Sequence, residues 1–590
     1  MYALPLVLIL LQSTPAPLQE ISRDSADALR DRARSAERTY EFLLRRLAPS
    51  RAVTGTFDAS RCDEVVGRFC LYYDGGNPKP LPEPTDIGKL TRARQDAVEA
   101  LRLAFAARPG DFETAGPLLR YLVEDERVAE AISAARAYFW ASRDSVWGPL
   151  LEGYALHLAG DAVAAEQRFE EALGHLGKVE AASRRSIAVL LDSRERRWYE
   201  QLSDDERAAY EDVVWRLADP LYLLPGNDRR AEHLARHVWS RLLATAPVVT
   251  YMWPWGRDLE ELTIRYGVPK GRERIFGMYV QGMVEHYDPG QRSFVPPALH
   301  HSGYPTAPPP GEDGPLHEVR ARSGYAPVTL RKLVDLPHQV SLFPEGDSVL
   351  LRIDAYLPFD SAVTVARTGL RGGLFLLDHR YKLTDTVAVN IRQIDDGVVA
   401  TGWHVVASGR HVYSLEVLED SSLLAGRARY AVEADLPATG PLLSSVVVSR
   451  PFGAATASIG RATEALQPLP ELVLSPNDTI GIYGEAHRLT PADGEVSRYR
   501  VELAFGPGER SPLLVRAVKW LGRSLGLASP PELPRLSWEG EAEAGHPAVV
   551  AVDVPLAPLS KGLYEISLTV TDLVTAEAAT SRRLIRIQKD

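Results

Sequence analysis

The spacing of apolar residues changes once along this chain of 590 residues, and this change limits the fold more than any other feature. Up to about residue 285 apolar residues recur mainly at helical spacing, whereas from about residue 328 they alternate with polar ones. A proline-rich stretch at 295–315 separates the two parts and is typical of an extended linker. Because one hydrophobic core rarely holds so long a chain, the sequence predicts a multidomain α + β protein with about three to five units.

Five segments in the second part alternate clearly enough to predict strands, and Gly and Pro turns separate them. They are residues 349–357, 386–391, 412–417, 498–503 and 562–570. Short strands of this kind are typical of β-sandwiches, and about 260 residues fit two of them. Gly-Leu-Tyr-Glu-Ile at 562–566 resembles a strand of many immunoglobulin-like accessory domains. We therefore expect two immunoglobulin-like β-sandwiches.

A repeat with a spacing of 34 residues organises the helical part. Its in-phase small residues are Ala97, Ala131 and Ala165. In the last copy Gly153 and Phe169 also stand at the small and aromatic positions of a tetratricopeptide repeat, so that residues 90–195 resemble this family. The resemblance implies paired helices that offer a concave binding surface and perform no reaction. A generic helical bundle is the alternative.

The N-terminus has the pattern of a secretory signal. Apolar residues Ala3–Leu11 are followed by the small and polar residues Gln12–Ala16, and the apolar run is too short to span a bilayer. No later stretch is long and apolar enough for a membrane span. We expect a soluble exported protein, and a buried N-terminal strand or helix end is the alternative.

The two cysteines, Cys62 and Cys70, stand eight residues apart. A disulfide needs Cα atoms about 4.4–6.8 Å apart, whereas eight residues of straight helix span about 12 Å. A bridge therefore requires the chain to fold back, which Gly67 permits, and it would fit an oxidising compartment. Buried free thiols are the alternative, because no further ligand stands at metal-binding spacing.

One short segment combines aromatic residues, a charged helical run and a turn. Its prominent residues are Trp253, Trp255, Asp258, Tyr266, Gly267 and Pro269. The tryptophans supply apolar area for a core, Asp258 can cap a helix, and Gly267 with Pro269 can end it. We interpret the segment as a structural junction. The functional alternative is a recognition pocket that includes Arg257 and Arg265.

The same segment resembles the GWxTD domain, which is named for Gly-Trp-any-Thr-Asp and has a Gly-x-Pro downstream. With Asp258 on the motif's Asp, Trp255, Gly267 and Pro269 fall on its other anchors, while Pro254 and Arg257 replace its Gly and Thr. The upstream elements that also resemble the family are Trp215, Asp219-Pro220 and the run from Asn227 through His233 to Arg236. The resemblance covers about residues 196–285. It implies an exported bacterial protein of uncharacterised role and no catalytic residues.

A metal site is a further hypothesis for the same region. His233 and His237 lie four residues apart on one face of a predicted helix, with Glu232 beside them. In metallopeptidases the Glu follows the first His, whereas here it precedes it, and Arg236 adds positive charge. Core or exposed histidines are the alternative. A basic amphipathic stretch at 514–525 suggests a helix that binds a membrane surface or a partner, and a helical crossover packed on its own sandwich is the alternative.

Charge limits the partners. A net charge of -11 and a pI near 5.8 argue against non-specific nucleic-acid binding, which requires basic surface. The expected partners are proteins of the cell envelope, with a glycan as a further candidate. We expect no cofactor and no defined catalytic activity, in an exported scaffold or protein-binding protein. The alternative is a metal-dependent hydrolase with its site in residues 196–285.

The predicted segments follow from these patterns. They are a signal peptide (1–17), an amphipathic helix with a cysteine-containing loop region (18–89), tetratricopeptide-like repeats (90–195), a GWxTD-type domain (196–292), a proline-rich linker (293–327) and two β-sandwiches (328–455 and 456–590).

Overall fold

The computed structural model confirms helices followed by β-sheets. It describes residues 23–52, 64–71, 83–191, 193–246, 254–267, 271–276, 281–286, 327, 329–358, 369–394, 397–453, 466–492, 495–508 and 534–588. The signal segment at 1–17, the basic stretch at 514–525 and nearly all of the linker at 293–327 lie outside these residues. The chain forms two compact units, 1–185 with 231–287 and 186–230 with 288–590, so the predicted segment 196–292 is divided between them.

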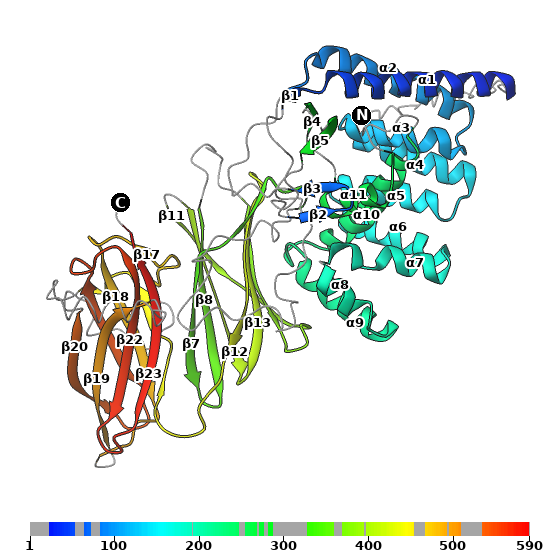
Figure 1. Cartoon of the computed structure of the whole chain (residues 1–590). Helices are drawn as coiled ribbons and strands as arrows, with labels where there is room; N and C mark the ends of the chain where they lie inside the picture. The colour runs from blue at the N-terminus through cyan, green and yellow to red at the C-terminus, as the bar shows by residue number, and fades with distance from the viewer. Residues whose placement is uncertain are drawn as a thin grey trace, which may run out of the picture. The chain divides into compact units, whose positions relative to one another are not determined.

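The first unit contains helices that pack on one another in chain order (Figure 1). They are α1 (Arg23–Leu47), α2 (Ile87–Ala107), α3 (Phe112–Glu124), α4 (Val128–Ser142), α5 (Trp147–Leu158), α6 (Ala162–His175) and α7 (Lys178–Arg185). Local chemistry sets several of the helix starts. The side chains of Asp86, Asp111 and Asp161 accept backbone N–H groups at the first turns of α2, α3 and α6.

Small residues let these helices approach closely. The in-phase alanines Ala97, Ala131 and Ala165 are each fully buried, on α2, α4 and α6. A Cβ atom on Gly153 would lie 2.8 Å from Cε1 of Phe169, so only glycine fits at this contact between α5 and α6. The repeat spacing therefore corresponds to a repeated packing position.

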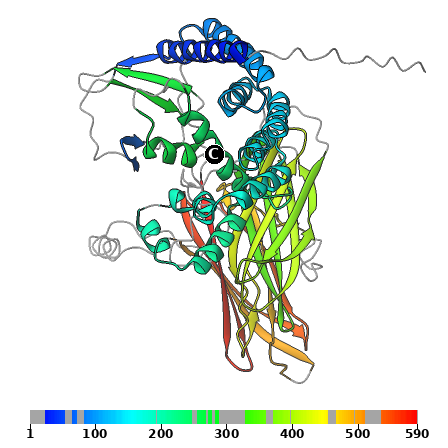
Figure 2. The same ribbon diagram turned by 90° about the vertical axis from the view of Figure 1, so that its right-hand side faces the viewer.

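Two later helices complete the core of the first unit. Helix α10 (Asp228–Ala244) starts at Asn227, whose side chain accepts the N–H of Arg230 at 3.0 Å. Trp239 of α10 stacks on Tyr154 of α5 with ring centroids 6.0 Å apart, and Arg120 of α3 lies 5.8 Å from its ring. Figure 2 shows α10 and α11 (Arg257–Tyr266), in green, along one side of the helical stack.

Short strands accompany these helices. A three-stranded sheet joins β1 (Ser50–Ala52), β4 (Gly271–Phe276) and β5 (Gln281–His286), and a hairpin joins β2 (Glu64–Val66) to β3 (Phe69–Leu71). Strands β4 and β5 lie in a region that the sequence indicates to be mainly helical. They were not predicted, because β4 pairs in parallel with β1, a partner very far away in the sequence.

The second unit contains two β-sandwiches. In the first, sheets β10-β9-β13-β14-β6 and β11-β12-β8-β7 share one core. The strands are β6 (Lys332–Asp335), β7 (His338–Glu345), β8 (Ser348–Pro358), β9 (Leu370–Leu377), β10 (Leu383–Ala388), β11 (Asn390–Ile394), β12 (Gly397–Ala407), β13 (Arg410–Glu419) and β14 (Leu424–Glu433). The strand predicted at 386–391 is two strands, because the chain changes sheets at Val389.

The second sandwich follows the same plan. A sheet of β15, β18, β16 and β21 packs on a sheet β17-β23-β22-β19-β20. The strands are β15 (Leu442–Leu443), β16 (Val447–Ser449), β17 (Val473–Leu474), β18 (Thr479–His487), β19 (Val496–Pro507), β20 (Arg535–Glu543), β21 (Ala548–Pro555), β22 (Gly562–Asp572) and β23 (Ala578–Ile587). The other four predicted strands are confirmed as β8, β13, β19 and β22.

A buried side-chain amide joins the two sandwiches. The Gln339 side chain on β7 donates to the backbone oxygens of Val448 and Leu469 at 2.8 Å and accepts the N–H of Val448 at 2.8 Å. Gln339 is fully buried, and burial of its amide without hydrogen-bond partners would destabilise the fold. These hydrogen bonds supply the partners.

A helical segment also packs on the first sandwich, through α8 (Ser193–Tyr199) and α9 (Asp204–Ala218). Arg429 of β14 donates to the backbone oxygens of Leu217 and Asp219 at 2.8 and 2.7 Å and pairs with Glu416 of β13 at 2.8 Å. Its guanidinium also lies 3.8 Å from the ring centroid of Tyr222. The C-terminal end of α9 is thus held by a buried cation from the sheet.

Replacing Arg429 with Met should destabilise the protein by about 3–5 kcal/mol, because it leaves the buried Glu416 carboxylate without its cation. Urea denaturation followed by circular dichroism measures the change. The double variant Arg429→Met with Glu416→Leu should recover part of the loss, since both charges are then removed but the backbone oxygens of Leu217 and Asp219 still lack their donor. Equal stability of the single variant and the wild type would show that this ion pair contributes nothing.

Candidate functional site

The first end of the predicted junction is tied to the β2–β3 hairpin. Arg68, in the turn of the hairpin, binds both carboxylate oxygens of Asp258 on α11 and donates to the backbone oxygen of Pro254 at 3.0 Å. Hydrogen bonds from Arg68 lower the pKa of Asp258 to about 2. Gly67 allows the hairpin turn, because its φ of +52° is in the region that favours glycine. Asp258 therefore anchors a loop to the start of a helix.

The other end of α11 is tied to α10. Helix α11 stops at Gly267, which has a φ of +75°. Nη1 of Arg236 donates to the backbone oxygens of Ile264 and Arg265 at 3.1 and 2.6 Å, and a Cβ on Gly267 would lie 3.0 Å from Nε of Arg236. Glycine is therefore required here both by the backbone and by the guanidinium beside it.

A buried acid balances that guanidinium. Glu232, one turn before Arg236 on α10, pairs with it at 2.5 Å, and its other oxygen lies 2.5 Å from Nε2 of His157 on α5. Burial alone would raise the pKa of Glu232, but Arg236 and His157 outweigh it and hold the pKa well below its ordinary value. This series of polar contacts links α5, α10 and α11 inside the core.

The aromatic residues of the junction serve packing. Tyr266 is 4% exposed and lies in a small cluster with Leu259 and Leu262, against which Trp255 packs. Trp255 also packs against the main core of the first unit. Trp253 and Pro269 lie outside the residues that the structure describes.

The surroundings of His233 and His237 do not favour the predicted metal site. The rings of His233 and His237 have centroids 4.9 Å apart, but the Glu232 carboxylate is engaged by Arg236 and His157. Burial, together with Arg184, lowers the pKa of His237 to about 3, so its ring is neutral at pH 7 with a cation nearby. Among the described residues no three His, Cys, Asp or Glu side chains are grouped to hold a metal ion.

The disulfide stays a prediction. Cys62 and the side chain of Cys70 lie outside the described part of the chain. The neighbouring backbone does fold back, because Val65 pairs with Cys70 across the β2–β3 hairpin.

Sequence reasoning missed a buried acidic cluster between α1 and α3. Arg120 pairs with Glu41 at 2.6 Å and with Glu124 at 2.9 Å, and Tyr121 donates to Glu41 at 3.0 Å. Glu37 lies beside them at 2% exposure, and its Oε1 atom accepts no hydrogen bond from a described residue. Burial, reinforced by Glu41 and opposed by Arg120, raises the pKa of Glu37 to about 7.

The signal for this cluster is present in the sequence. Glu37 and Glu41 fall four and eight residues after Ala33, on the helix face that also carries Tyr40. Acidic residues on the apolar face of a predicted helix indicate buried partners, and Arg120 is that partner.

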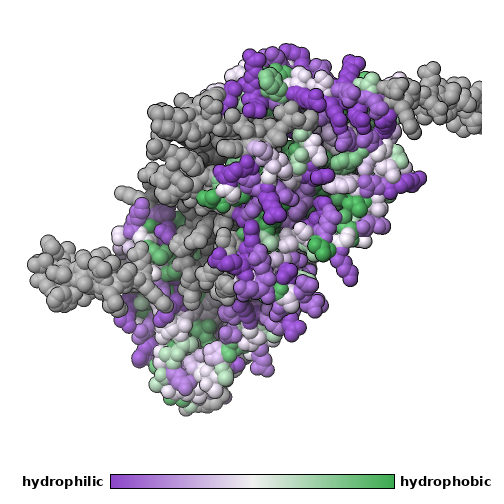
Figure 3. All heavy atoms as spheres, turned by 45° about the vertical axis from the view of Figure 1, so that its right-hand side comes forward, coloured by the Kyte–Doolittle hydropathy of each residue, from purple (hydrophilic) through white to green (hydrophobic). Residues whose placement is uncertain are grey.

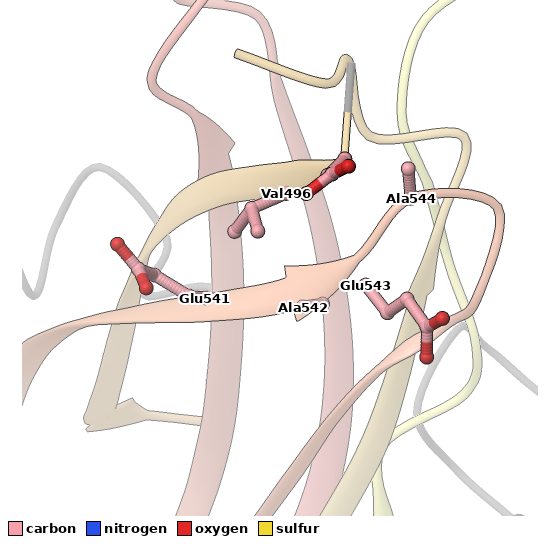
Figure 4. A pocket seen from close by; sticks show the side chains of 6 residues that line it. Val496, Glu541, Ala542, Glu543 and Ala544 are labelled. Atoms are coloured by element: carbon pink, nitrogen blue, oxygen red, sulfur yellow. The ribbon is translucent and has the colours of Figure 1, made fainter. Parts of the chain in front are cut away.

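A shallow hollow lies on the second sandwich, at the ends of β19 and β20 (Figure 4). The residues that line it are Glu495, Val496, Glu541, Ala542, Glu543 and Ala544. Glu541 pairs with Arg498 at 3.1 Å, and Glu543 lies 3.8 Å from His546. These carboxylates already have cationic or titratable partners on the surface.

Comparison with known proteins gives no family. No family model and no curated protein matches the chain. A DUF4785 family protein from Legionella pneumophila matches 42% of this chain and 55% of its own length at 9% identity, with a TM-score of 0.13. Elastase-activated alpha-2-macroglobulin from Escherichia coli matches 45% of this chain and 23% of its own at 10% identity, with a TM-score of 0.15. Likeness at this level does not bear on function.

The Gly267→Ala variant should lose about 2 kcal/mol or more of stability, because the new Cβ meets a strained backbone and the Arg236 guanidinium together. Gly346→Ala is the matched control. Gly346 also has a positive φ, +63°, but apart from its own chain neighbours no described residue has an atom within 4 Å of its added Cβ. We expect a loss of about 1 kcal/mol there. Equal losses in thermal denaturation would argue against the contact with Arg236.

The Glu37→Gln variant should remove a pH dependence of stability. The folded protein keeps the Glu37 proton up to a pKa of about 7, whereas the unfolded carboxyl loses it near 4.5. Wild-type stability should therefore fall by about 3 kcal/mol relative to Glu37→Gln as the pH rises through this window. Denaturation curves at pH 4 to 8 test this, with exposed Glu99→Gln expected to follow the wild type. Parallel curves for wild type and Glu37→Gln would contradict it.

Proposed function

We propose that this protein is an exported scaffold or protein-binding protein of the bacterial cell envelope. The apolar run Ala3–Leu11 supports export, and helices followed by two sandwiches support a role in holding partners. Among the helices of the described ranges, none is long and apolar enough to cross a membrane.

We propose further that residues 90–195 form tetratricopeptide-like repeats and that the sandwiches are immunoglobulin-like. The buried in-phase alanines and the contact of Gly153 with Phe169 support the first assignment. A divergent GWxTD-type domain at 196–292 is proposed on its sequence motif. The contacts of Asp258 and Gly267 give its anchor positions a structural role.

We propose that α4 carries the surface that binds the partner. The surface of α3 and α5 is already covered by α10. Trp239 of α10 already covers Tyr154 of α5 and Arg120 of α3. Trp140 of α4, in contrast, is 64% exposed, and the Arg143 guanidinium lies 5.0 Å from its ring. Exposed Trp and Arg side chains are the residue types that most often dominate binding energy in protein interfaces. This exposed pair is the observation that carries the proposal.

Trp140→Ala should abolish or strongly reduce capture of a partner from native envelopes, because removal of an interface Trp typically costs 2 kcal/mol or more, or about thirtyfold in affinity. Affinity purification after mild crosslinking, with quantitative mass spectrometry, measures the loss. Trp403→Ala is the matched control, since Trp403 is also exposed, at 39%, but lies on β12. A partner held equally by both variants would contradict the assignment of α4, and absence of any envelope partner would contradict the proposed function.

A further inference from the structure

The outward face of α1 carries arginines around an exposed aromatic ring. The face starts at Arg38, and Phe42, Arg45 and Arg46 lie four, seven and eight residues after it. These spacings place the four side chains on one side of the helix. Phe42 is 58% exposed, and Arg38 and Arg46 are exposed as well. Figure 3 shows hydrophilic side chains crowded along the upper edge of the molecule, where α1 and α2 lie.

This face has an excess of positive charge because the two acids of α1 next to it in sequence point inward. Glu37 and Glu41 are buried against α3, so they do not neutralise the surface of α1. Arg38, Arg45 and Arg46 make no ion pair with any residue in the described ranges. Asp31 is the acid nearest to this face along the same helix side.

The occupant that fits this face is an anionic phospholipid surface. Guanidinium groups bind phosphate oxygens, and a phenyl ring between them can enter the boundary between headgroups and acyl chains. The chain as a whole has a net charge of -11, so its average charge does not favour an anionic membrane. Attraction must therefore come from a local patch, and polybasic segments of this kind bind anionic leaflets.

We propose that the Arg38–Phe42–Arg45–Arg46 face of α1 docks the protein on an anionic phospholipid bilayer. The face lies flat on the headgroups while the opposite side of α1 stays packed on α2. This docking adds a membrane contact to the scaffold role and does not depend on the identity of any protein partner.

Flotation of the full chain with phosphatidylcholine vesicles, with and without phosphatidylglycerol, tests the proposal. The wild type should bind the anionic vesicles and release from them at high salt. The triple variant Arg38→Ala, Arg45→Ala, Arg46→Ala should bind about a hundredfold more weakly. The single variant Phe42→Ser should also bind more weakly than the wild type. The loss should appear even at low salt, because insertion of the ring does not depend on charge.

Two controls separate this face from other causes. The triple variant Arg331→Ala, Arg380→Ala, Arg450→Ala removes the same charge from exposed positions of the second unit and should bind as the wild type does. Leu8→Asp in the apolar N-terminal run should also retain salt-sensitive binding, since that run lies outside α1. Equal loss in both triple variants, loss only in Leu8→Asp, or equal binding to neutral vesicles would overturn the proposal.

Discussion

Two buried arginines hold the ends of helices in this protein, and much of the described structure depends on them. The last carbonyl groups of a helix lack intrahelical partners and carry partial negative charge. Arg236 reaches those of α11, and Arg429 reaches those of α9. A guanidinium is costly to bury alone, and in each case a glutamate, Glu232 or Glu416, lies beside it. The same solution thus joins helix to helix in one unit and helix to sheet in the other.

This interaction explains why the junction segment has its composition. Asp258 and Gly267 mark the two ends of α11, and each one meets an arginine from another element. Between them Leu259, Leu262 and Tyr266 turn inward. Polar contacts therefore hold both ends of the segment, and apolar side chains pack between them. Its charged groups stabilise the fold.

Local patterns predicted much of the fold, and long-range pairing limited the rest. Alternation identified β8, β13, β19 and β22, because this signal depends on neighbouring residues. The pairing of β1 with β4 could not be predicted, since neither strand signals its partner. The link of Arg68 to Asp258 likewise joins distant segments. The Glu37 cluster was accessible to sequence reasoning, but identifying Arg120 required the packing of α3 on α1.

The division of the chain into two interleaved units has a consequence for the order of folding. The first unit takes 1–185 and then 231–287, with a stretch of the second unit between them. Tyr154 and Arg120 therefore have no Trp239 to cover them until the chain has been made through α10. A chain that emerges from its N-terminus must hold an unfinished helical core while the intervening segment follows. Neither unit can be isolated by a single cut, because each one is built from two separate stretches of the chain.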